Sequence, residues 1–198
     1  MAQRPDFFLW TGVTLALLAA YDFYRNQAAA SSEAGTGTGT GTADNPITQA
    51  LNAALPMDVS PSGQSFIKSQ EGFAPTRHND AGHQAIGYGH DIVAGDDIPA
   101  RIDRSQANNI FLNDMARVAG FLQSVLKVSV TQNQFDALAS LAYNIGFGAF
   151  RSSTLLRLLN QGNYRGAAAQ FPRWNQSAGR VDDGLVRRRR SEQQLFNS

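Results

Sequence analysis

Two stretches in the second half of the chain carry hydrophobic residues at the three-to-four-residue spacing of an amphipathic helix. The first follows a capping-box pair, Asp103 with Gln106, and its apolar positions are Ile110, Phe111, Val118, Phe121, Leu122 and Val125. The second follows Thr131 with Gln134, and its apolar positions are Phe135, Leu138, Leu141, Ala142 and Ile145. Both stretches are therefore predicted to be helices with one buried face.

The other patterns beyond Ser60 predict shorter elements. Ser60 and Pro61 are typical of a helix start, and this helix should run into Glu71. Proline, asparagine and glycine punctuate residues 74–93, which predicts a small hairpin or meander. Further helices are expected from Ser153 to Gly162 and over residues 165–171. The fold class is therefore α+β: a small β lobe inserted between helices, then a helical lobe, with a cleft between the lobes.

The N-terminal region has a different pattern. Residues 7–21, FFLWTGVTLALLAAY, carry no charge. A helix of that length reaches about 22 Å, which is short of the roughly 30 Å hydrocarbon core of a membrane. A short membrane anchor and a cleaved signal peptide both fit, whereas a soluble helix fits poorly because the stretch has no polar face. Such an anchor would place the folded region on the periplasmic side of the inner membrane.

A linker is expected between this segment and the folded region. Gly and Thr alternate from Gly35 to Thr42, and residues 26–46 hold no apolar side chain larger than alanine. Such a segment cannot offset the entropy lost when its backbone is ordered. The expected organisation is a membrane anchor or signal segment at 1–25, a flexible linker at 26–59 and a folded domain at 60–198.

Composition narrows the chemistry available to the folded region. The 198 residues include no cysteine, which excludes disulfides, Cys-ligated zinc, iron–sulfur clusters and thiol catalysis. The formal net charge of +1 gives no reason to expect a nucleic-acid partner. Beyond Asp58, however, 15 basic residues face 11 acidic ones, and this excess of +4 suits an anionic polymer.

Two carboxylates are placed where the predicted lobes meet. Glu71 ends the first helix, and Asp80 lies nine residues later in a turn that could direct it back toward Glu71. Glycoside hydrolysis requires such a pair, one as a proton donor and one as a charged partner for water or the sugar cation. The alternative is that both residues only cap a turn and a helix end.

The sequence EGFAPTRHNDAGHQAIGYGH, residues 71–90, resembles the catalytic signature of the phage-type lysozymes, glycoside hydrolase family 24. Residues 134–164, 167–176 and 184–196 are similar to the helical-lobe and C-terminal segments of the same family. The resemblance implies a lysozyme-like two-lobed fold, with Glu71 as general acid and Asp80 as the second catalytic carboxylate. The usual threonine is replaced by Ala85, so the group that holds the attacking water stays open among Thr76, His78 and His83.

The resemblance also implies further site residues. Tyr143, Asn144 and Ser153 fall where the family lines its saccharide groove, although Tyr143 could simply pack and Ser153 could simply cap a helix. The run from Arg187 to Arg190 could form a solvated helix face, or it could hold Glu71 or the glycan, with Arg187 as the expected cleft member.

Three residues of the signature are expected to shape the site rather than react. Gly87 and Gly89 should allow tight backbone paths, and His90 should pack or form an ion pair between the lobes. No metal ligand set and no cofactor are expected.

The sequence thus predicts a muramidase that cleaves the β-1,4 bond between N-acetylmuramic acid and N-acetylglucosamine in bacterial peptidoglycan. Its catalytic domain is expected to be monomeric, and the N-terminal segment would bring it to the cytoplasmic membrane. The alternatives are a lytic transglycosylase, which Ala85 favours, and a virion-associated glycan-binding module with weakened activity.

Overall fold

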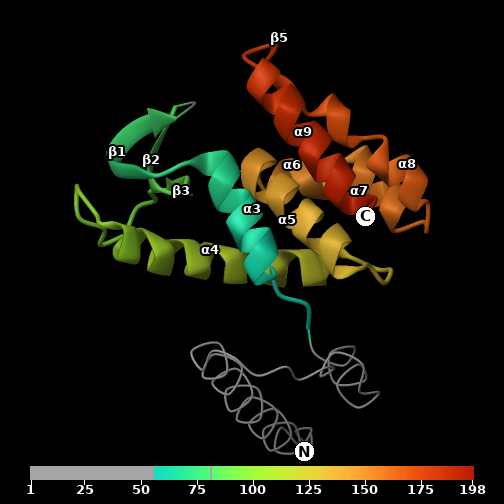
Figure 1. The fold of residues 1–198 in the computed structure, drawn as a ribbon, viewed down its shortest axis with the longest axis horizontal. Helices are drawn as coiled ribbons and strands as arrows, with labels where there is room; N and C mark the ends of the chain where they lie inside the picture. Colours follow the sequence, from blue (N-terminus) through green and yellow to red (C-terminus); the bar gives the residue numbers. More distant parts are fainter. Residues whose placement is uncertain (1–55, 81) are drawn as a thin grey trace, which may run out of the picture. The chain divides into compact units, whose positions relative to one another are not determined.

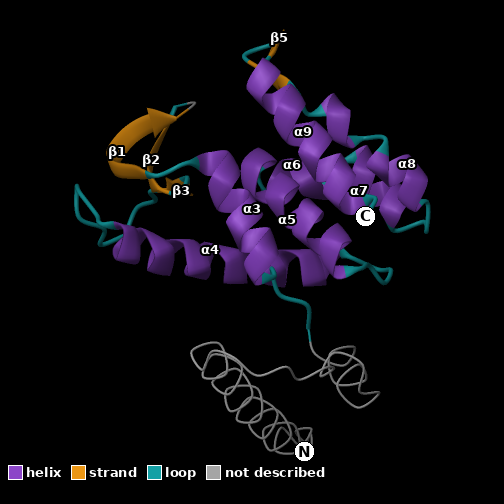
Figure 2. Ribbon diagram, in the orientation of Figure 1, coloured by secondary structure: helices purple, strands orange, loops and turns teal. Residues whose placement is uncertain are grey.

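The computed structural model describes residues 56–80 and 82–198, and Figures 1 and 2 show the arrangement of its elements. A helix, a small sheet and a long helix come first: α3 (Pro61–Glu71), β1 (Ala74–Asp80), β2 (His83–Gly87), β3 (His90–Asp91) and α4 (Arg104–Val125). The remainder is mostly helical: α5 (Gln132–Ile145), α6 (Phe147–Arg151), α7 (Thr154–Leu159), α8 (Tyr164–Ala168), the 3-10 helix η1 (Phe171–Arg173), β4 (Gln176–Ser177), β5 (Arg180–Val181) and α9 (Asp183–Phe196).

Polar side chains cap the first three of these helices. The Ser60 side chain accepts a hydrogen bond from the backbone N–H of Gly63, and capping boxes open α4 at Asp103 and α5 at Thr131. Each cap satisfies N–H groups that a helix start leaves without intrahelical partners. The predicted helices that run into Glu71 and over the two amphipathic stretches are therefore confirmed.

The predicted hairpin is an antiparallel sheet in the order β1-β2-β3. Ala85 of β2 pairs with His78 of β1 and with Asp91 of β3, whereas the next residue, Ile86, pairs with His90. Successive side chains of a strand point to opposite faces. His78, Ala85 and Asp91 consequently share one face of the sheet, and Ile86 shares the other with His90.

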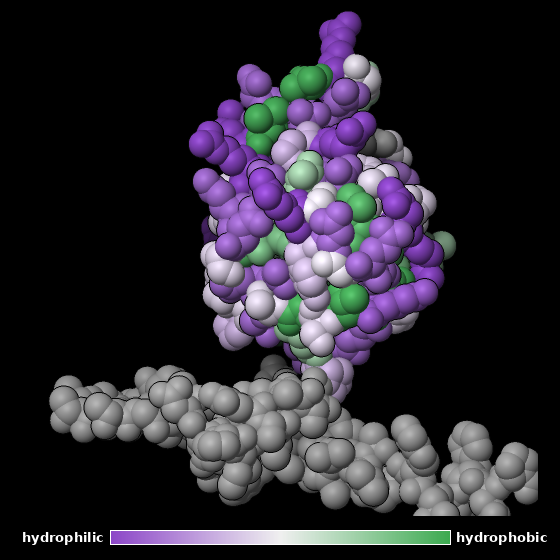
Figure 3. All heavy atoms as spheres, turned by 90° about the vertical axis from the view of Figure 1, so that its right-hand side faces the viewer, coloured by the Kyte–Doolittle hydropathy of each residue, from purple (hydrophilic) through white to green (hydrophobic). Residues whose placement is uncertain are grey.

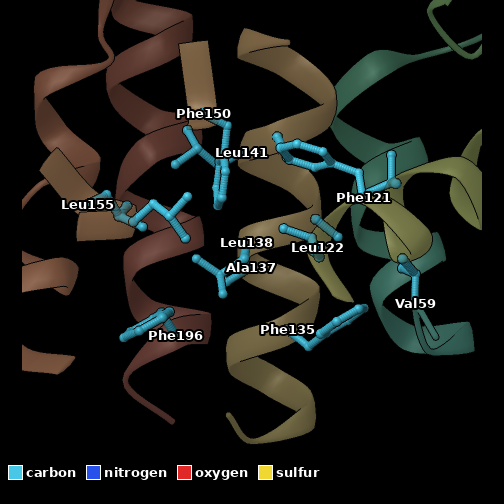
Figure 4. Packing of buried hydrophobic residues seen from close by; sticks show 14 of the residues in the cluster. Val59, Phe121, Leu122, Phe135, Ala137, Leu138, Leu141, Phe150, Leu155 and Phe196 are labelled. Carbon is cyan, nitrogen blue, oxygen red and sulfur yellow. The ribbon is translucent and has the colours of Figure 1, made fainter. Parts of the chain in front are cut away.

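The large hydrophobic core is built around α5. Figure 4 shows side chains of α5 in this core, among them Phe135, Leu138 and Leu141, together with Leu122 of α4 and Phe196 of α9. Leu138 and Leu141 are fully buried. The helices thus form one lobe because several of them bury an apolar face against α5.

A much smaller core lies against the sheet. It consists of Ile86 from β2 with Ile102 and Ala107, and half-buried residues such as Phe73 pack around it. Ala107 lies in the first turn of α4, whereas Phe111 of the same helix belongs to the large core. α4 therefore joins the two lobes, and the predicted α+β architecture is confirmed.

Several short elements differ from the sequence expectation. The single helix expected over 165–171 is wrong in its extent, because α8 ends at Ala168 and Pro172 lies within the separate helix η1. α6 and the β4–β5 hairpin were not predicted. The arginine run does lie on a helix, α9, but Arg188 and Arg189 are buried, so a wholly solvated face is wrong.

Apolar packing and hydrogen bonds hold the residues just before α3 against the helical lobe. Val59 is buried in the large core, and Gln123 Nε2 donates to the Met57 carbonyl oxygen at 2.7 Å. Ser60 donates both its backbone N–H (3.0 Å) and its hydroxyl to the carboxylate of Asp136 on α5. The packed region therefore includes residues 57–59, which the sequence pattern placed in the linker.

The anchor or signal segment at 1–25 and nearly all of the linker at 26–59 lie outside the described residues. Across residues 56–80 and 82–198, every helix is too short or too polar to cross a membrane. On the face drawn in Figure 3, hydrophilic side chains predominate and hydrophobic ones lie scattered among them.

Candidate active site

Glu71 is the last residue of α3, so the end of this helix sets the position of its carboxyl group. Its side chain is 17% exposed. Gly89, in the turn between β2 and β3, faces it so closely that a Cβ atom at Gly89 would lie 2.9 Å from Glu71 Oε2. Gly89 also has a φ of +79°, a conformation that favours glycine. Glycine is therefore required at position 89 for two reasons: the backbone conformation of the turn, and the space that Glu71 occupies.

Gly87 has a related role at the end of β2. Its φ is +70°, and a Cβ there would meet Ala107 Cβ and Ile102 Cδ1 at 3.3 Å. This glycine lets the turn approach the small core closely. Gly89 thus shapes the backbone beside Glu71, whereas Gly87 shapes the backbone against the small core.

Arg188 of α9 approaches Glu71 from the helical lobe. Its Nη2 lies 2.7 Å from Glu71 Oε1, and its side chain is 7% exposed. Arg187, which we expected in the cleft, is exposed, and the contact with Glu71 belongs to the next residue. The rotation of α9 decides this difference, because adjacent helical residues point about 100° apart.

A buried polar cluster lies behind Arg188. It comprises Arg188, Arg189 and Glu192 of α9 with Ser140 of α5, and Glu192 is fully buried. Burial raises the pKa of Glu192 and lowers the pKa of Arg189 to about 10, because both environments disfavour the charged form. Sequence reasoning missed Glu192 and Ser140 as neighbours of the site. Their signal was the spacing of Glu192, three and four residues after two of the arginines.

Tyr143 of α5 joins the two lobes. Its hydroxyl donates to the backbone carbonyl oxygen of Tyr88 at 2.9 Å and lies 3.3 Å from Asp114 Oδ2. Burial, and then the negative charges of Asp114 and Glu71, raise the pKa of Tyr143. Tyr143 is thus a half-buried group near Glu71, and the next residue, Asn144, is exposed.

His90 forms a second connection between the lobes. Its Nδ1 lies 2.9 Å from Asp114 Oδ2 on α4, and its Nε2 lies 3.4 Å from Asp96 Oδ2. The hydrogen bond with Asp114 is the largest cause that raises the pKa of His90, and burial opposes it. His90 therefore pairs with Asp114 on α4, a partner that sequence reasoning did not foresee.

Ser153 lies apart from this arrangement. It is buried, and its side chain accepts a hydrogen bond from the Leu156 backbone N–H at the start of α7. This is the helix-cap interpretation that the sequence left open beside the saccharide-groove one. The structure gives Ser153 no contact with Glu71.

The second expected carboxylate, Asp80, ends β1, and its side chain lies outside what the structure describes. Ala85 is buried on the sheet face that it shares with His78 and Asp91. Of the three residues that could replace the usual threonine, His78 is therefore the direct cross-strand neighbour of Ala85. Asp91, which sequence reasoning missed, flanks Ala85 on the other side. In the described part of the chain, no three potential ligands among His, Asp and Glu gather into a metal site.

Comparison with known proteins gives consistent results over this region. The phage lysozyme family model matches residues 68–192, more than half of the chain. The endolysin of Bacillus phage PZA is 49% identical over 151 residues, which cover 72% of this chain and 56% of that protein. The endolysin of Salmonella phage P22 is 38% identical over 146 residues, covering 72% and 99% respectively. The SAR-endolysin of Enterobacteria phage P21 is 33% identical over 150 residues, covering 74% and 87%.

Solved structures give the same assignment. The endolysin from Escherichia coli O157:H7 phage FAHEc1 has a TM-score of 0.63 and 35% identity, over 71% of this chain and 93% of its own. The muramidase domain of SpmX from Asticaccaulis excentricus has a TM-score of 0.64 and 34% identity, over 71% and 97%. The chain spans about half the length of the Bacillus phage endolysins, 56% of the PZA protein and 54% of the B103 protein. Together these matches establish that the chain belongs to the phage lysozyme family.

Proposed function

We propose that this protein is a peptidoglycan hydrolase, a muramidase that cleaves the β-1,4 bond between N-acetylmuramic acid and N-acetylglucosamine. The observation that carries the proposal is the position of Glu71. Its carboxyl group is mostly enclosed at the junction of the two lobes, against Gly89 on one side and Arg188 on the other. An enclosed carboxyl group at such a junction suits a general acid, and several relatives at 33–49% identity are named endolysins or SAR-endolysins.

The proposed reaction uses two carboxyl groups. Glu71 gives its proton to the glycosidic oxygen of the leaving N-acetylglucosamine as the bond from that oxygen to C1 of N-acetylmuramic acid breaks. Water adds to C1, and Asp80 accepts the proton that the water loses or stabilises positive charge on the sugar. Ala85 offers no hydrogen bond to that water, so His78 and Asp91, its neighbours in the sheet, are the groups placed to do so.

A lytic transglycosylase is the second candidate, and Ala85 is the observation that favours it. In that reaction the 6-hydroxyl of N-acetylmuramic acid attacks C1, so no water needs to be held. The products distinguish the two candidates, because hydrolysis leaves reducing ends and transglycosylation leaves 1,6-anhydro ends. A binding module with weakened activity would release no products.

Replacement of Glu71 by Gln tests the proposal. The amide is nearly isosteric but donates no catalytic proton, so we expect a loss of about 10²–10⁴-fold in the rate of peptidoglycan cleavage. Asp97→Asn, at an exposed loop position, is the matched control and should retain wild-type turnover. Mass spectrometry of released muropeptides should find reducing ends. A Glu71→Gln variant with more than about a tenth of wild-type turnover would overturn the assignment of the acid.

The proposed site of action is the periplasmic face of the host inner membrane, with residues 1–25 as the membrane segment. The name of the SAR-endolysin relatives and the uncharged stretch 7–21 support this placement. Deletion of residues 1–25 should preserve activity on isolated peptidoglycan but abolish lysis from within expressing cells. Lysis by the truncated protein without any membrane-permeabilising helper would contradict the export role, and a mature N-terminus near Ser31 would identify a cleaved signal instead.

A further inference from the structure

Behind the ion pair of Glu71 and Arg188 lies a second carboxylate, Glu192, with no exposure to solvent. Its Oε1 accepts hydrogen bonds from Ser140 Oγ at 2.7 Å, Arg188 Nε at 3.1 Å and Arg189 Nη2 at 2.9 Å. Its Oε2 lies 2.9 Å from Arg189 Nε. Three donors therefore converge on Oε1 of this buried carboxylate, whereas Oε2 has only the ion pair with Arg189 and no hydrogen bond.

This cluster is costly to bury, because its charged groups are removed from water. α5 and α9 already meet through apolar side chains such as Leu138 and Phe196. Charged groups removed from water recover their hydration energy only when their geometry is good, and apolar residues of similar volume often serve stability as well. The cluster does, however, hold the guanidinium of Arg188 in one orientation, which stability alone would not require.

Arg188 is held from two directions. Its Nε donates to Glu192, and its Nη2 lies 3.3 Å from the backbone carbonyl oxygen of Ser140 and 2.7 Å from Glu71 Oε1. The planar guanidinium cannot rotate away from Glu71 without losing its bond to Glu192. Its positive charge is also shared between two carboxylates, one at the site and one in the interior.

We propose that Glu192 and Ser140 are positioning residues that hold Arg188 against Glu71 and offset part of the Arg188 charge, and that they thereby set the pH range over which the enzyme is active. This inference rests on the proposed function, because it assigns a role to the acid of that reaction. Neither residue touches substrate in this scheme, and both act through Arg188.

The sign of the effect follows from the charges around Glu71. With Glu192 ionised, the three charged members of the cluster carry a net charge of +1. A neutral residue at position 192 raises this to +2, and the added positive charge beside Glu71 should move the alkaline limb of the activity profile to lower pH. The other titratable groups that share this surrounding with Glu71 are the same in both proteins: Tyr143 on α5, Asp114 on α4 and Asp91 in the sheet.

The test compares Glu192→Gln with Glu192→Asp and the wild type. For each protein, kcat and KM on peptidoglycan fragments are measured from pH 4 to pH 9. We expect the alkaline limb of the Glu192→Gln profile to lie about one pH unit lower, with KM within a factor of two of wild type. Glu192→Asp keeps the charge and should keep the limb near its wild-type position. Arg190→Gln, on the exposed side of α9, controls for a general change of charge and should move nothing.

A limb at the wild-type position in a folded Glu192→Gln protein would overturn the inference. If that variant does not fold, Ser140→Ala takes its place, because the Ser140 hydrogen bond favours the ionised form of Glu192 and its loss reduces the negative charge that offsets Arg188. The limb should then move in the same direction by a smaller amount, and an unmoved limb would overturn the inference equally. If Glu71→Gln is inactive and the pH profile of Glu192→Gln is unaltered, only this inference is contradicted. If the wild-type protein releases no products from peptidoglycan, the proposed function itself is contradicted.

Discussion

The two lobes that meet at Glu71 are stabilised in different ways. The helical lobe surrounds α5 with a continuous apolar core that includes Leu138, Leu141 and Phe150, all fully buried. In the part of the chain that the structure describes, the cluster of the β lobe consists of three buried residues, Ile86, Ile102 and Ala107. Polar contacts to the helical lobe supplement this small core, chiefly from His90 to Asp114 and from Tyr143 to the Tyr88 backbone.

The two sides of the active site are therefore supported by different lobes. Arg188 and the cluster behind it belong to the lobe with the large core, whereas Gly89 belongs to the lobe with the small one. Apolar burial changes little with pH, but a bond to histidine depends on its protonation. The β-lobe side of the site should therefore be both the less stable and the more pH-sensitive of the two.

The largest expected effect comes from a cavity in the helical core. Leu138→Ala should lower the free energy of unfolding by about 2–5 kcal/mol, because the fully buried site can relax only partly around the lost atoms. Urea denaturation followed by circular dichroism measures this loss. Ile86→Ala, the matched change in the β lobe, should cost less overall and should mainly speed hydrogen exchange in residues 74–91. Equal losses with uniform exchange would show that the two cores are one cooperative unit.

His90→Asn sharpens the comparison through pH. The raised pKa of His90 means that the folded protein binds the proton more tightly than the unfolded chain does. Its contribution is therefore complete below about pH 6.5, the ordinary value for histidine, and is lost as the pH rises through the raised value. Asparagine can replace the donor at Nδ1 but cannot gain a charge.

Denaturation of wild type and His90→Asn at pH 5.5 and pH 8.5 measures this contribution. The difference in free energy of unfolding should be about 1–2 kcal/mol at pH 5.5 and clearly smaller at pH 8.5. A difference that is the same at both values would mean that His90 contributes through packing and not through its charge.

The smallest effect is expected from Tyr143→Phe. The change removes the hydroxyl that donates to the Tyr88 carbonyl oxygen and should cost about 1 kcal/mol. Because the pKa of Tyr143 is raised, the hydroxyl stays protonated throughout the range in which His90 loses its proton. The loss in free energy of unfolding should thus be equal at pH 5.5 and pH 8.5. A loss that changes with pH as the His90→Asn loss does would show that the two contacts titrate together.

Local signals explain why much of the fold is predictable from sequence. The caps at Ser60, Asp103 and Thr131 act within four residues, and the apolar periodicity of α4 and α5 extends over several turns. The β4 and β5 strands have two residues each, and α6 has five, so neither a period nor a face can be recognised in them.

The site was less predictable, because its contacts depend on how distant elements are rotated and paired. Four consecutive arginines look alike in sequence, and only the packing of α9 against α5 brings Arg188 to Glu71 and leaves Arg187 in solvent. Likewise, Asp114 becomes the partner of His90 only because α4 passes beside β3. The position of Glu71 at a helix end was predictable, because the start and end of that helix are marked by local sequence signals.

The hydrogen bonds that hold residues 57–60 against the helical lobe have a mechanical consequence. Besides the bonds from Gln123 to Met57 and from Ser60 to Asp136, Gln132 Nε2 donates to the Asp58 carbonyl oxygen at 2.9 Å and Gln64 Nε2 to that of Val59 at 3.0 Å. Glu71 lies at the opposite end of α3, about 16 Å away along the helix axis. A tensile load that enters from the N-terminal side is therefore transferred to α4 and α5 before it reaches Glu71. In an optical trap with one handle attached ahead of Met57, Asp136→Asn should reduce the unfolding force. An unchanged force would mean that the hydrogen bonds between Ser60 and Asp136 do not carry the load.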